Sequence, residues 1–383
     1  MAYQHIDIDY LQSSKKEAAP CGDTVWFKRT LYHTTIICAD GISSGVKAFI
    51  ASQMNVARIG QLLEGGASFQ ETFQSVVNSM SQWRDYTMPF TAFIMVRTLI
   101  DGTTTILNYE MPSPILVTRN RASVVKAEPM IVEAGVASSF HCRFQQGDSI
   151  ILMSDGITQS GMGTLYPNGW GSQGVEKCVN QWLRRGSSVF EAMHKVFDQA
   201  KINDGEVNGD DRTVMYAQSR LGRVVEVLTG PPLDEKSDEE FATRFLESDG
   251  TKVICGATTA DIVARYKFIT LQVEQNPSSM STPPRYYIDG VDLVTEGAVT
   301  LNQVHNLLEE EDLDRDSDMS AAVDLAKIFK SGDRIIFTVG QSLNPANKNI
   351  VFRKQGILQR NKIIPMIAQK LEKMGKLVSI EHV

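Results

Sequence analysis

The sequence predicts an α+β fold over residues 1–222, in which antiparallel strands form layers with helices, and a second, smaller α/β domain over residues 223–383. Three observations lead to this prediction. In the first part, runs of strand-like residues are followed by helical patterns set apart from them. The amino-acid composition changes near Gly230-Pro231-Pro232, and the acidic stretch Asp234–Glu240 follows. The length of 383 residues exceeds that of one average domain.

The elements of the first part follow from residue patterning. A β-branched run stops at Asp40-Gly41, an apolar stretch with helical composition follows, and two later runs flank the hairpin signal Asp101-Gly102. Ser188 and Glu191 have capping-box spacing at the start of a helix. The predicted strands are Thr34–Cys38, Thr91–Leu99, Thr103–Tyr109, Ile115–Thr118, Ser123–Lys126, Ser149–Met153 and Thr213–Ala217, and the predicted helices include Val46–Leu63 and Phe69–Met80.

The second part alternates strand-like and helical segments, which is typical of an α/β unit. The predicted strands are Lys252–Cys255 and Arg334–Val339, and the predicted helices are Thr259–Tyr266, Leu301–Glu311, Ala321–Phe329 and Ile363–Met374.

Composition excludes several classes of protein. The formal net charge is −7 with no run of Lys and Arg, so nucleic-acid binding is not expected. No stretch approaches 18 apolar residues, so a membrane span is not expected, and the N-terminus lacks the pattern of a signal peptide. The five cysteines are odd in number and form no CxxC pair, which indicates a reducing compartment. We therefore expect a cytoplasmic protein, and the sequence leaves its oligomeric state open.

Three acidic turns in the first part, at Asp40, Asp155 and Asp210-Asp211, stand next to apolar strand-like runs. They lie 115 and 55 residues apart, so only the fold can bring them together. Crowded carboxylates repel one another unless cations lie between them, and oxygen ligands favour Mg²⁺ or Mn²⁺. Two such ions suit phosphoester hydrolysis. The alternative is purely structural, because Asp-Gly is a common turn dipeptide. Patterning alone does not decide between the two.

Five segments add a family resemblance: CADGISSGVKAFIAS, FTAFIMV, ILNYEMPSPILV, GDSIILMSDGITQSG and DDRT, in this order. Over about residues 15–220 they resemble the type 2C metal-dependent protein phosphatases (PPM family), and most closely the bacterial stage II sporulation E (SpoIIE-like) subfamily. The resemblance implies an αββα sandwich, in which two antiparallel sheets are flanked by helices.

The resemblance also implies a role for each matching residue. Asp40 would bridge two divalent cations, Mn²⁺ or Mg²⁺, with the Gly41 carbonyl on one of them, while Asp155 and Asp210 would bind the other. Asp23 would hold metal-bound water, Asp211 would support the site, and Thr213 would orient the turn or serve as a plain strand residue. Two segments depart from the family pattern, Ile42-Ser43-Ser44 and Met111-Pro112-Ser113-Pro114, and they bear on which phosphoprotein fits.

Other side chains are weaker candidates. His33 and His141 have no partner spacing and are expected to be structural, and Cys38 is expected to pack inside its strand. Cys21 precedes Gly22-Asp23 and is a metal ligand only as a minor alternative. Arg84 or Arg97 would contact a substrate phosphate, and the sequence does not choose between them.

Two features of the second part remain ambiguous. Cys255-Gly256-Ala257-Thr258-Thr259 places a glycine turn before a helix, which fits an anion site, but capping of the helix by Thr258 is the favoured interpretation. Asp289, Asp292 and Glu296 resemble an oxygen-ligand cluster, which turn chemistry explains equally well.

The expected function is therefore a protein serine/threonine phosphatase whose metal-activated water hydrolyses phosphoserine or phosphothreonine on a bacterial signalling protein. In the resembling family, phosphorylated anti-anti-sigma-like partners are the usual substrates. The alternatives are a catalytically silent scaffold that binds a phosphoprotein, and a regulator that senses a small ligand through the C-terminal domain.

Overall fold

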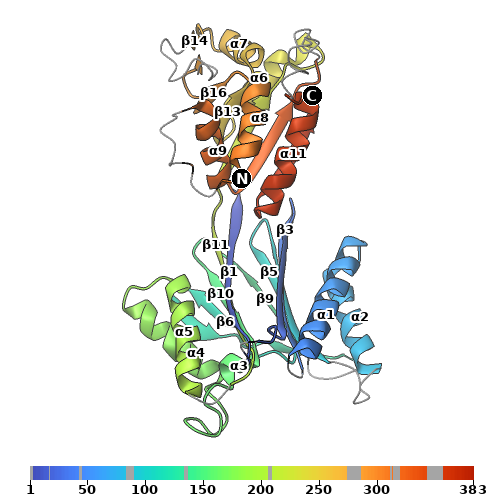
Figure 1. Cartoon of the computed structure of the whole chain (residues 1–383), viewed down its shortest axis with the longest axis vertical. Coiled ribbons are helices and arrows are strands. Elements are labelled where there is room, and N and C mark those ends of the chain that lie inside the picture. The colour runs from blue at the N-terminus through green and yellow to red at the C-terminus, as the bar shows by residue number, and fades with distance from the viewer. Residues whose placement is uncertain are drawn as a thin grey trace. The chain divides into compact units, whose positions relative to one another are not determined.

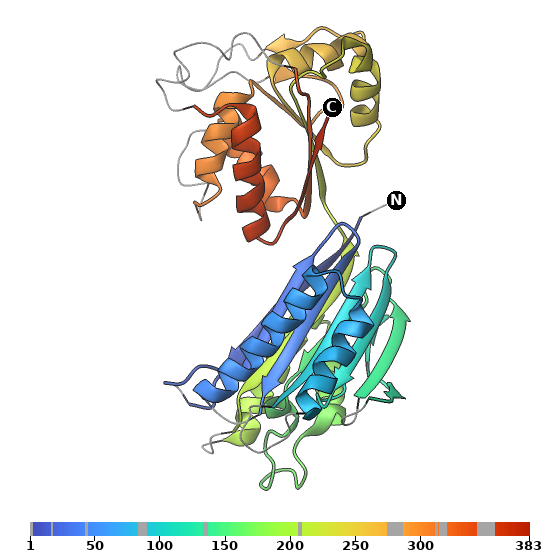
Figure 2. The ribbon, with the colours of Figure 1, turned by 90° about the vertical axis from the view of Figure 1, so that its right-hand side faces the viewer.

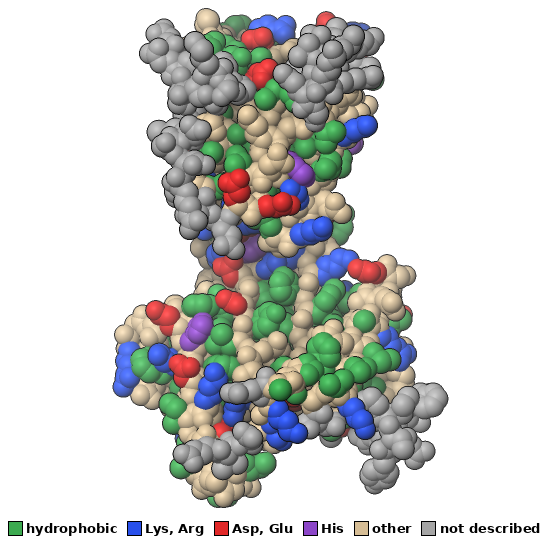
Figure 3. Space-filling view, viewed as in Figure 1, with side chains coloured by type: hydrophobic (Ala, Val, Ile, Leu, Met, Phe, Trp, Pro, Cys, Tyr) green, Lys and Arg blue, Asp and Glu red, His purple; other side chains and the backbone are tan. Residues whose placement is uncertain are grey.

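The structure is a computed structural model that describes residues 3–16, 18–42, 45–82, 90–132, 137–205, 209–273, 286–310, 313, 320–342 and 357–383. The chain divides into two compact units (Figures 1, 2 and 3). The N-terminal unit is Gln4–Leu221, and the C-terminal unit comprises Met1–Tyr3 and Gly222–Val383. Within the described residues, no helix is both long and apolar enough to cross a membrane.

The N-terminal unit contains two antiparallel sheets. One has five strands in the order β1-β11-β10-β6-β7, and the other has six in the order β2-β3-β4-β5-β9-β8. Their bounds are β1 Gln4–Ser13, β2 Asp23–Arg29, β3 His33–Gly41, β4 Thr91–Leu99, β5 Thr103–Tyr109, β6 Ile115–Thr118, β7 Arg121–Val124, β8 Glu128–Met130, β9 Ala137–Arg143, β10 Ser149–Met153 and β11 Arg212–Leu221.

Helices cover the outer faces of both sheets. One pair, α1 (Val46–Glu64) and α2 (Phe69–Gln82), packs on the six-stranded sheet around Ile59, Phe73 and Phe93. The other pair, α4 (Gly171–Arg184) and α5 (Val189–Asp204), packs on the five-stranded sheet. A third core lies between the two sheets. The predicted αββα sandwich is confirmed, and Figure 1 shows its layers.

Strand β3 shows how the sequence specifies these layers. Ile36 and Cys38 face the core between the sheets, whereas Ile37 and Ala39 face the helices. Side chains alternate between the two faces of a strand, and at residues 36–39 both faces are buried, so this stretch is apolar throughout. The capping box at α5 is also confirmed, because the Glu191 backbone N–H donates to Ser188 Oγ and the Ser188 N–H donates to Glu191 Oε2.

The C-terminal unit is built on a seven-stranded sheet in the order β14-β15-β16-β13-β12-β17-β18. The strands from β16 to β18 are parallel, and β14 and β15 add an antiparallel edge. Their bounds are β12 Val224–Thr229, β13 Thr251–Cys255, β14 Gln272–Val273, β15 Tyr286–Tyr287, β16 Leu293–Thr295, β17 Arg334–Val339 and β18 Leu377–His382. The chain order reverses between β12 and β17, as in doubly wound folds.

Helices lie on both faces of this sheet, as the α/β prediction requires. The short helix η1 (Glu235–Ser237) leads into α6 (Asp238–Leu246), which packs with α7 (Ala257–Tyr266) on one face. The other face carries α8 (Ala298–Leu307), α9 (Ala321–Ser331) and α11 (Arg360–Lys373). The predicted helix Leu301–Glu311 is shifted in the structure, because α8 begins at Ala298 and ends at Leu307.

Candidate metal centre

Strand pairing places two of the aspartates side by side. Asp23 opens β2 and Asp40 lies near the end of β3, and the antiparallel register sets the two residues opposite each other. Asp23 is only 3 % exposed, and both its carboxylate oxygens lack a hydrogen-bond partner of ordinary geometry among the described residues. A buried carboxylate without partners is costly, so this position favours a neighbouring cation.

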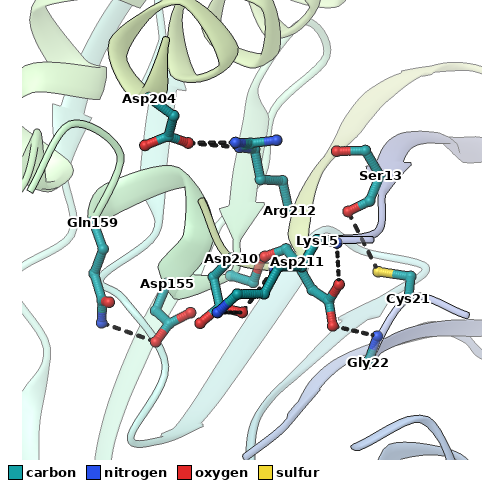
Figure 4. A network of polar contacts seen from close by, with 11 residues as sticks. Ser13, Lys15, Cys21, Gly22, Asp155, Gln159, Asp204, Asp210, Asp211 and Arg212 are labelled. Carbon is teal, nitrogen blue, oxygen red and sulfur yellow. Dashed lines mark hydrogen bonds and ion pairs between the residues drawn. The ribbon is translucent and has the colours of Figure 1, made fainter. Parts of the chain in front are cut away.

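Asp155 reaches the same region from the other sheet. It follows β10 as the first residue of the short helix α3 (Asp155–Thr158). The Thr213 backbone N–H donates to Ser154 Oγ over 2.9 Å, and the Ser154 N–H donates to the Thr213 carbonyl over 3.0 Å. These two bonds fix the end of β10 against the start of β11. Gln159 Nε2 then donates to Asp155 Oδ2 over 2.9 Å (Figure 4).

Asp210 and Asp211 precede β11 and serve different purposes (Figure 4). Asp211 Oδ1 accepts from the backbone N–H of Lys15 at 2.6 Å, and its Oδ2 accepts from that of Gly22 at 2.8 Å. Both oxygens of Asp211 are therefore committed to holding two distant backbone segments. Asp210 accepts the backbone N–H of Asp211 at Oδ1, and the Lys15 ammonium lies 3.8 Å from the same oxygen.

The glycines of the two Asp-Gly pairs allow close backbone approach. A β-carbon at Gly41 would lie 2.1 Å from the Ala48 carbonyl oxygen of α1, and one at Gly156 would lie 2.0 Å from the Asp211 carbonyl oxygen. Neither glycine has a positive φ. They are required because another segment passes against them, rather than for a turn that only glycine can adopt.

Electrostatics link these carboxylates into one cluster. Burial, and then the charges of Asp23 and Asp155, raise the pKa of Asp40 to about 9. Burial also raises the pKa of Asp23 to about 6, against the lowering effect of the Thr213 and Ser154 hydroxyls. The pKa of Asp155 is raised by burial and then by Asp210. The structure thus brings Asp23, Asp40, Asp155 and Asp210 within electrostatic reach of one another.

The donor set fits a hard divalent cation. Every candidate ligand is an oxygen atom, as Mg²⁺ and Mn²⁺ prefer. In the described part of the chain, no three His, Cys, Asp or Glu side chains are close enough together to form a ready-made metal cage. Asp40 is nonetheless within electrostatic reach of both Asp23 and Asp155, which supply only oxygen donors.

Several candidates from the sequence lie away from this cluster. The β3–β4 register pairs Arg97 with Thr35, five residues along β3 from Asp40, and Arg97 donates to Thr35 Oγ1 and lies over the Phe69 ring. His33 is at the opposite end of β3, and His141 contacts Thr105. Arg84, Ser43 and Ser44 fall outside the described residues.

The cysteines and the remaining departure from the family pattern have structural roles. Burial and the nearby Asp23 charge raise the pKa of Cys21 to about 12, and its Sγ donates to the Ser13 carbonyl over 3.8 Å. Cys38 is buried in the core between the sheets. At the second departure, the Asn108 side chain exchanges two hydrogen bonds with the Met111 backbone, which closes the turn after β5.

Sequence reasoning missed three residues of the site. Ser154 was recognisable only as the residue before an Asp-Gly pair, and Gln159 only as the residue four positions after Asp155. No local sequence pattern identifies Lys15 as a site residue. Its ion pair with Asp210 and its backbone hydrogen bond to Asp211 join residues that lie almost the whole length of the unit apart in the sequence. Arg212, within DDRT, is not available to a phosphate, because its guanidinium pairs with Asp204 and donates to it from Nε over 3.0 Å.

Comparison with known protein families gives a match. Residues 32–220 match the model of the family described as stage II sporulation protein E (SpoIIE). The resemblance to SpoIIE-like phosphatases is confirmed. None of the curated proteins compared with the chain matches it. Within this SpoIIE-like unit, the match spans the segments that carry Asp40, Asp155 and Asp210.

Three of the solved structures that are similar to the chain come from Bacillus subtilis, Mycobacterium tuberculosis and Pseudomonas aeruginosa. The phosphatase domain of SpoIIE from Bacillus subtilis, with a fragment of its regulatory domain, is 16 % identical with a TM-score of 0.47; the match covers 57 % of this chain and 65 % of that one, which is less than two thirds. The RsbU and RsbW domains of a Mycobacterium tuberculosis protein are 17 % identical (TM-score 0.49, covering 70 % and 75 %). The SiaA-PP2C domain of Pseudomonas aeruginosa is 14 % identical (TM-score 0.45, covering 55 % and 85 %).

The raised pKa of Asp40 leads to a stability prediction for metal-free protein. Between the ordinary pKa near 3.8 and the folded value of about 9, the folded state binds more protons than the unfolded state, so stability falls as pH rises. Asp40→Asn removes this effect. In EDTA at pH 8 we expect the variant to melt about 2–4 °C or more above wild type. A change of about 1 kcal/mol in the free energy of unfolding produces a shift of this size in a domain of this length.

The pH dependence provides the control for this experiment. At pH 4 the difference between the two melting temperatures should be much smaller, because Asp40 is then protonated in the folded protein and nearly half protonated in the unfolded chain. A variant that melts below wild type at pH 8 in EDTA would contradict the repulsion between these carboxylates.

Proposed function

We propose that the SpoIIE-like unit hydrolyses phosphoserine or phosphothreonine on a bacterial signalling phosphoprotein, with two divalent cations, Mn²⁺ or Mg²⁺, held by Asp40, Asp155 and Asp210. The observation that best supports this proposal is the convergence of carboxylates from both sheets on one site, where burial and mutual repulsion raise the pKa of Asp40 to about 9. With this pKa, Asp40 becomes ionised at neutral pH only when positive charge is added beside it.

The protein's own residues have distinct parts in this proposal. Asp40, the Gly41 carbonyl, Asp155 and Asp210 would hold the cations, and Asp23 lies directly opposite Asp40 on β2. When bound, such cations supply an activated water and stabilise the charge on the phosphoryl oxygens. Asp211 keeps the backbone of Lys15 and Gly22 in place beside the site.

A catalytically silent phosphoprotein-binding scaffold is the competing proposal. It would not need the acidic cluster, whose repulsion is a cost that binding alone does not require. The resemblance to SpoIIE-like phosphatases implies a class of substrate, because anti-anti-sigma-like phosphoproteins are the usual substrates in that family. We extend that substrate class to this chain as part of the proposal.

Phosphate release from synthetic phosphopeptides tests this function. With Mn²⁺ present, we expect full-length protein to release phosphate from phosphoserine and phosphothreonine peptides and to act much more slowly on a phosphotyrosine peptide. Asp155→Asn is the matched control and should lose the activity. Binding of the phosphopeptides without any release of phosphate would instead support the scaffold.

A truncation tests whether the SpoIIE-like unit works alone. Its three cores are made only of its own residues, and domains with separate cores usually fold independently. A truncated chain of residues 4–221 should therefore be soluble and hydrolyse p-nitrophenyl phosphate within about twofold of the full-length rate, since a small substrate needs only the acidic cluster. We expect the rate on the native phosphoprotein to change. An insoluble or inactive truncation, with the full-length protein active, would refute this division of labour.

A further inference from the structure

The C-terminal unit has a pocket at the carboxyl ends of its parallel strands. It is lined by residues that follow β12, β13 and β16 and by Arg360, and its volume is about 170 Å³. Doubly wound sheets bind ligands at this edge, close to the point where the strand order reverses. The volume is below the roughly 300–1,000 Å³ typical of drug-sized ligands, so the pocket suits a small ligand.

Glycines shape the floor of the pocket. Gly230 follows β12, Gly256 follows β13 and Gly297 precedes α8, and their φ angles of 76°, 136° and 125° are ones that other residues rarely adopt. A β-carbon at Gly297 would lie 3.2 Å from the Gly256 α-carbon, so the two turns touch. The starts of α7 and α8 are therefore side by side, with no side chain between the turns.

Both of these helices begin without a cap. Gly256 and Gly297 occupy the cap positions, and neither helix receives a side-chain capping bond. The expected capping by Thr258 is thus wrong, because α7 starts directly after β13 and Thr258 lies inside its first turn. The backbone N–H groups that open a helix have no partner within it, and together with the helix dipole they favour an anion.

A buried hydroxyl at the pocket points to a ligand independently. Thr259 is 1 % exposed, it lines the pocket, and its Oγ1 has no hydrogen-bond partner among the described residues. Oγ1 would lie 3.2 Å from a β-carbon placed on Gly256, so the hydroxyl is at the turn that opens α7. Leaving a buried hydroxyl unsatisfied is unfavourable, and a bound oxygen acceptor would satisfy it.

Arg360 adds a fixed positive charge. Its Nη2 donates to the carbonyl oxygens of Gly340 at 2.8 Å and Ser342 at 3.0 Å, which holds the guanidinium at the pocket. Its Nη1 would lie 1.8 Å from a β-carbon placed on Gly230, and Gly230 has a positive φ. Both features favour glycine at this position beside the guanidinium. Glu296, an exposed acid, also lines the pocket. Its carboxylate can accept hydrogen bonds from the hydroxyl groups of a ligand, but it would repel the anionic group of that ligand.

We propose that this pocket binds the phosphate group of a small phosphorylated ligand, a sugar phosphate or mononucleotide. The phosphate would lie against the first N–H groups of α7 and α8, accept a hydrogen bond from Thr259 Oγ1, and face the Arg360 guanidinium. The ligand's hydroxyl groups would lie toward Glu296. This site is independent of the aspartates of the SpoIIE-like unit.

Calorimetric titration of full-length protein in EDTA tests the proposal, because the chelator removes cations that would let the aspartate cluster bind phosphate. The probes are AMP and ribose 5-phosphate, with adenosine and ribose as their unphosphorylated counterparts. We expect the phosphorylated probes to bind and the counterparts not to bind. Tighter binding of AMP would identify a nucleotide, and equal binding of the two would identify a sugar phosphate.

Two isosteric variants provide the sharper comparison. Thr259→Val removes only the unpaired hydroxyl, so it should fold normally and weaken binding about tenfold or more. Thr72→Val removes an equally buried, unpaired hydroxyl in the other unit and should leave binding unchanged. Arg360→Gln, which removes the charge, should also weaken binding, and it serves as the second variant if Thr259→Val fails to fold.

Three results would overturn the proposal. One is that neither phosphorylated probe binds at a concentration of about 10 mM. A dissociation constant above this concentration would be too weak to indicate a specific site. Another is binding of adenosine as tight as that of AMP, which would mean that the phosphate is not recognised. The third is binding of wild-type strength by both Thr259→Val and Arg360→Gln.

Discussion

Replacing Asp40 or Asp210 by asparagine should lower the turnover of p-nitrophenyl phosphate by more than about 100-fold in saturating Mn²⁺. Losing a partner that merely hydrogen-bonds a metal ligand typically costs about 10–100-fold, and these substitutions would remove charged ligands of the proposed metal centre. Each change preserves the shape of the side chain, so the loss should occur with the fold intact. Steady-state kinetics and a melting curve on each variant measure the two effects separately.

Asp211→Asn is the matched control for Asp210→Asn, because it makes the same chemical change one residue away. Both oxygens of Asp211 accept backbone N–H groups, from Lys15 and Gly22. An amide provides only one oxygen, so one of these bonds is lost and stability should fall by about 1–3 kcal/mol. Measured well below its melting temperature, this variant should keep far more activity than Asp210→Asn. The reverse order of activities would show that Asp211 is the ligand.

The layers of the N-terminal unit could be predicted because each layer leaves a pattern in the sequence. The central residues 36–39 of strand β3 are apolar on both faces, and the strand ends at Asp40-Gly41, a turn dipeptide. Strand β1 was not predicted, since Asp7 and Asp9 interrupt its apolar residues. It exists because it pairs with β11 along ten residues. That pairing also extends β11 to Leu221, beyond the predicted end at Ala217.

The C-terminal unit was harder to predict in detail. Strand β12 lies just beyond the expected domain boundary and was not predicted, although it is central to the sheet. The start of α7 is set by the end of β13 rather than by a capping side chain, so a search for Ser, Thr, Asp or Asn caps placed it two residues late. Asp292 of the suspected acidic cluster instead accepts the backbone N–H of Lys252.

Long-range hydrogen bonds at the acidic site were invisible in the sequence. The acidic turns could be recognised because Asp followed by Gly, or by a second Asp, marks the end of a strand. The different duties of Asp210 and Asp211 depend on backbone groups 189 and 196 residues away in the chain. Local sequence patterns do not indicate such distant partners. Only the pairing of strands in both sheets brings these backbone groups and Asp211 together.

The central claim is that the acidic cluster works only with bound cations. Its carboxylates range from half-buried to buried, and burial and the charges of Asp23 and Asp155 raise the pKa of Asp40. In the proposed function, cations would both ionise Asp40 and supply the chemistry. The most direct test is the hydrolysis of p-nitrophenyl phosphate by full-length protein, first in excess EDTA and then after addition of Mn²⁺ or Mg²⁺. We expect EDTA to abolish hydrolysis and Mn²⁺ to restore it, whereas an unchanged rate in excess chelator would contradict the account.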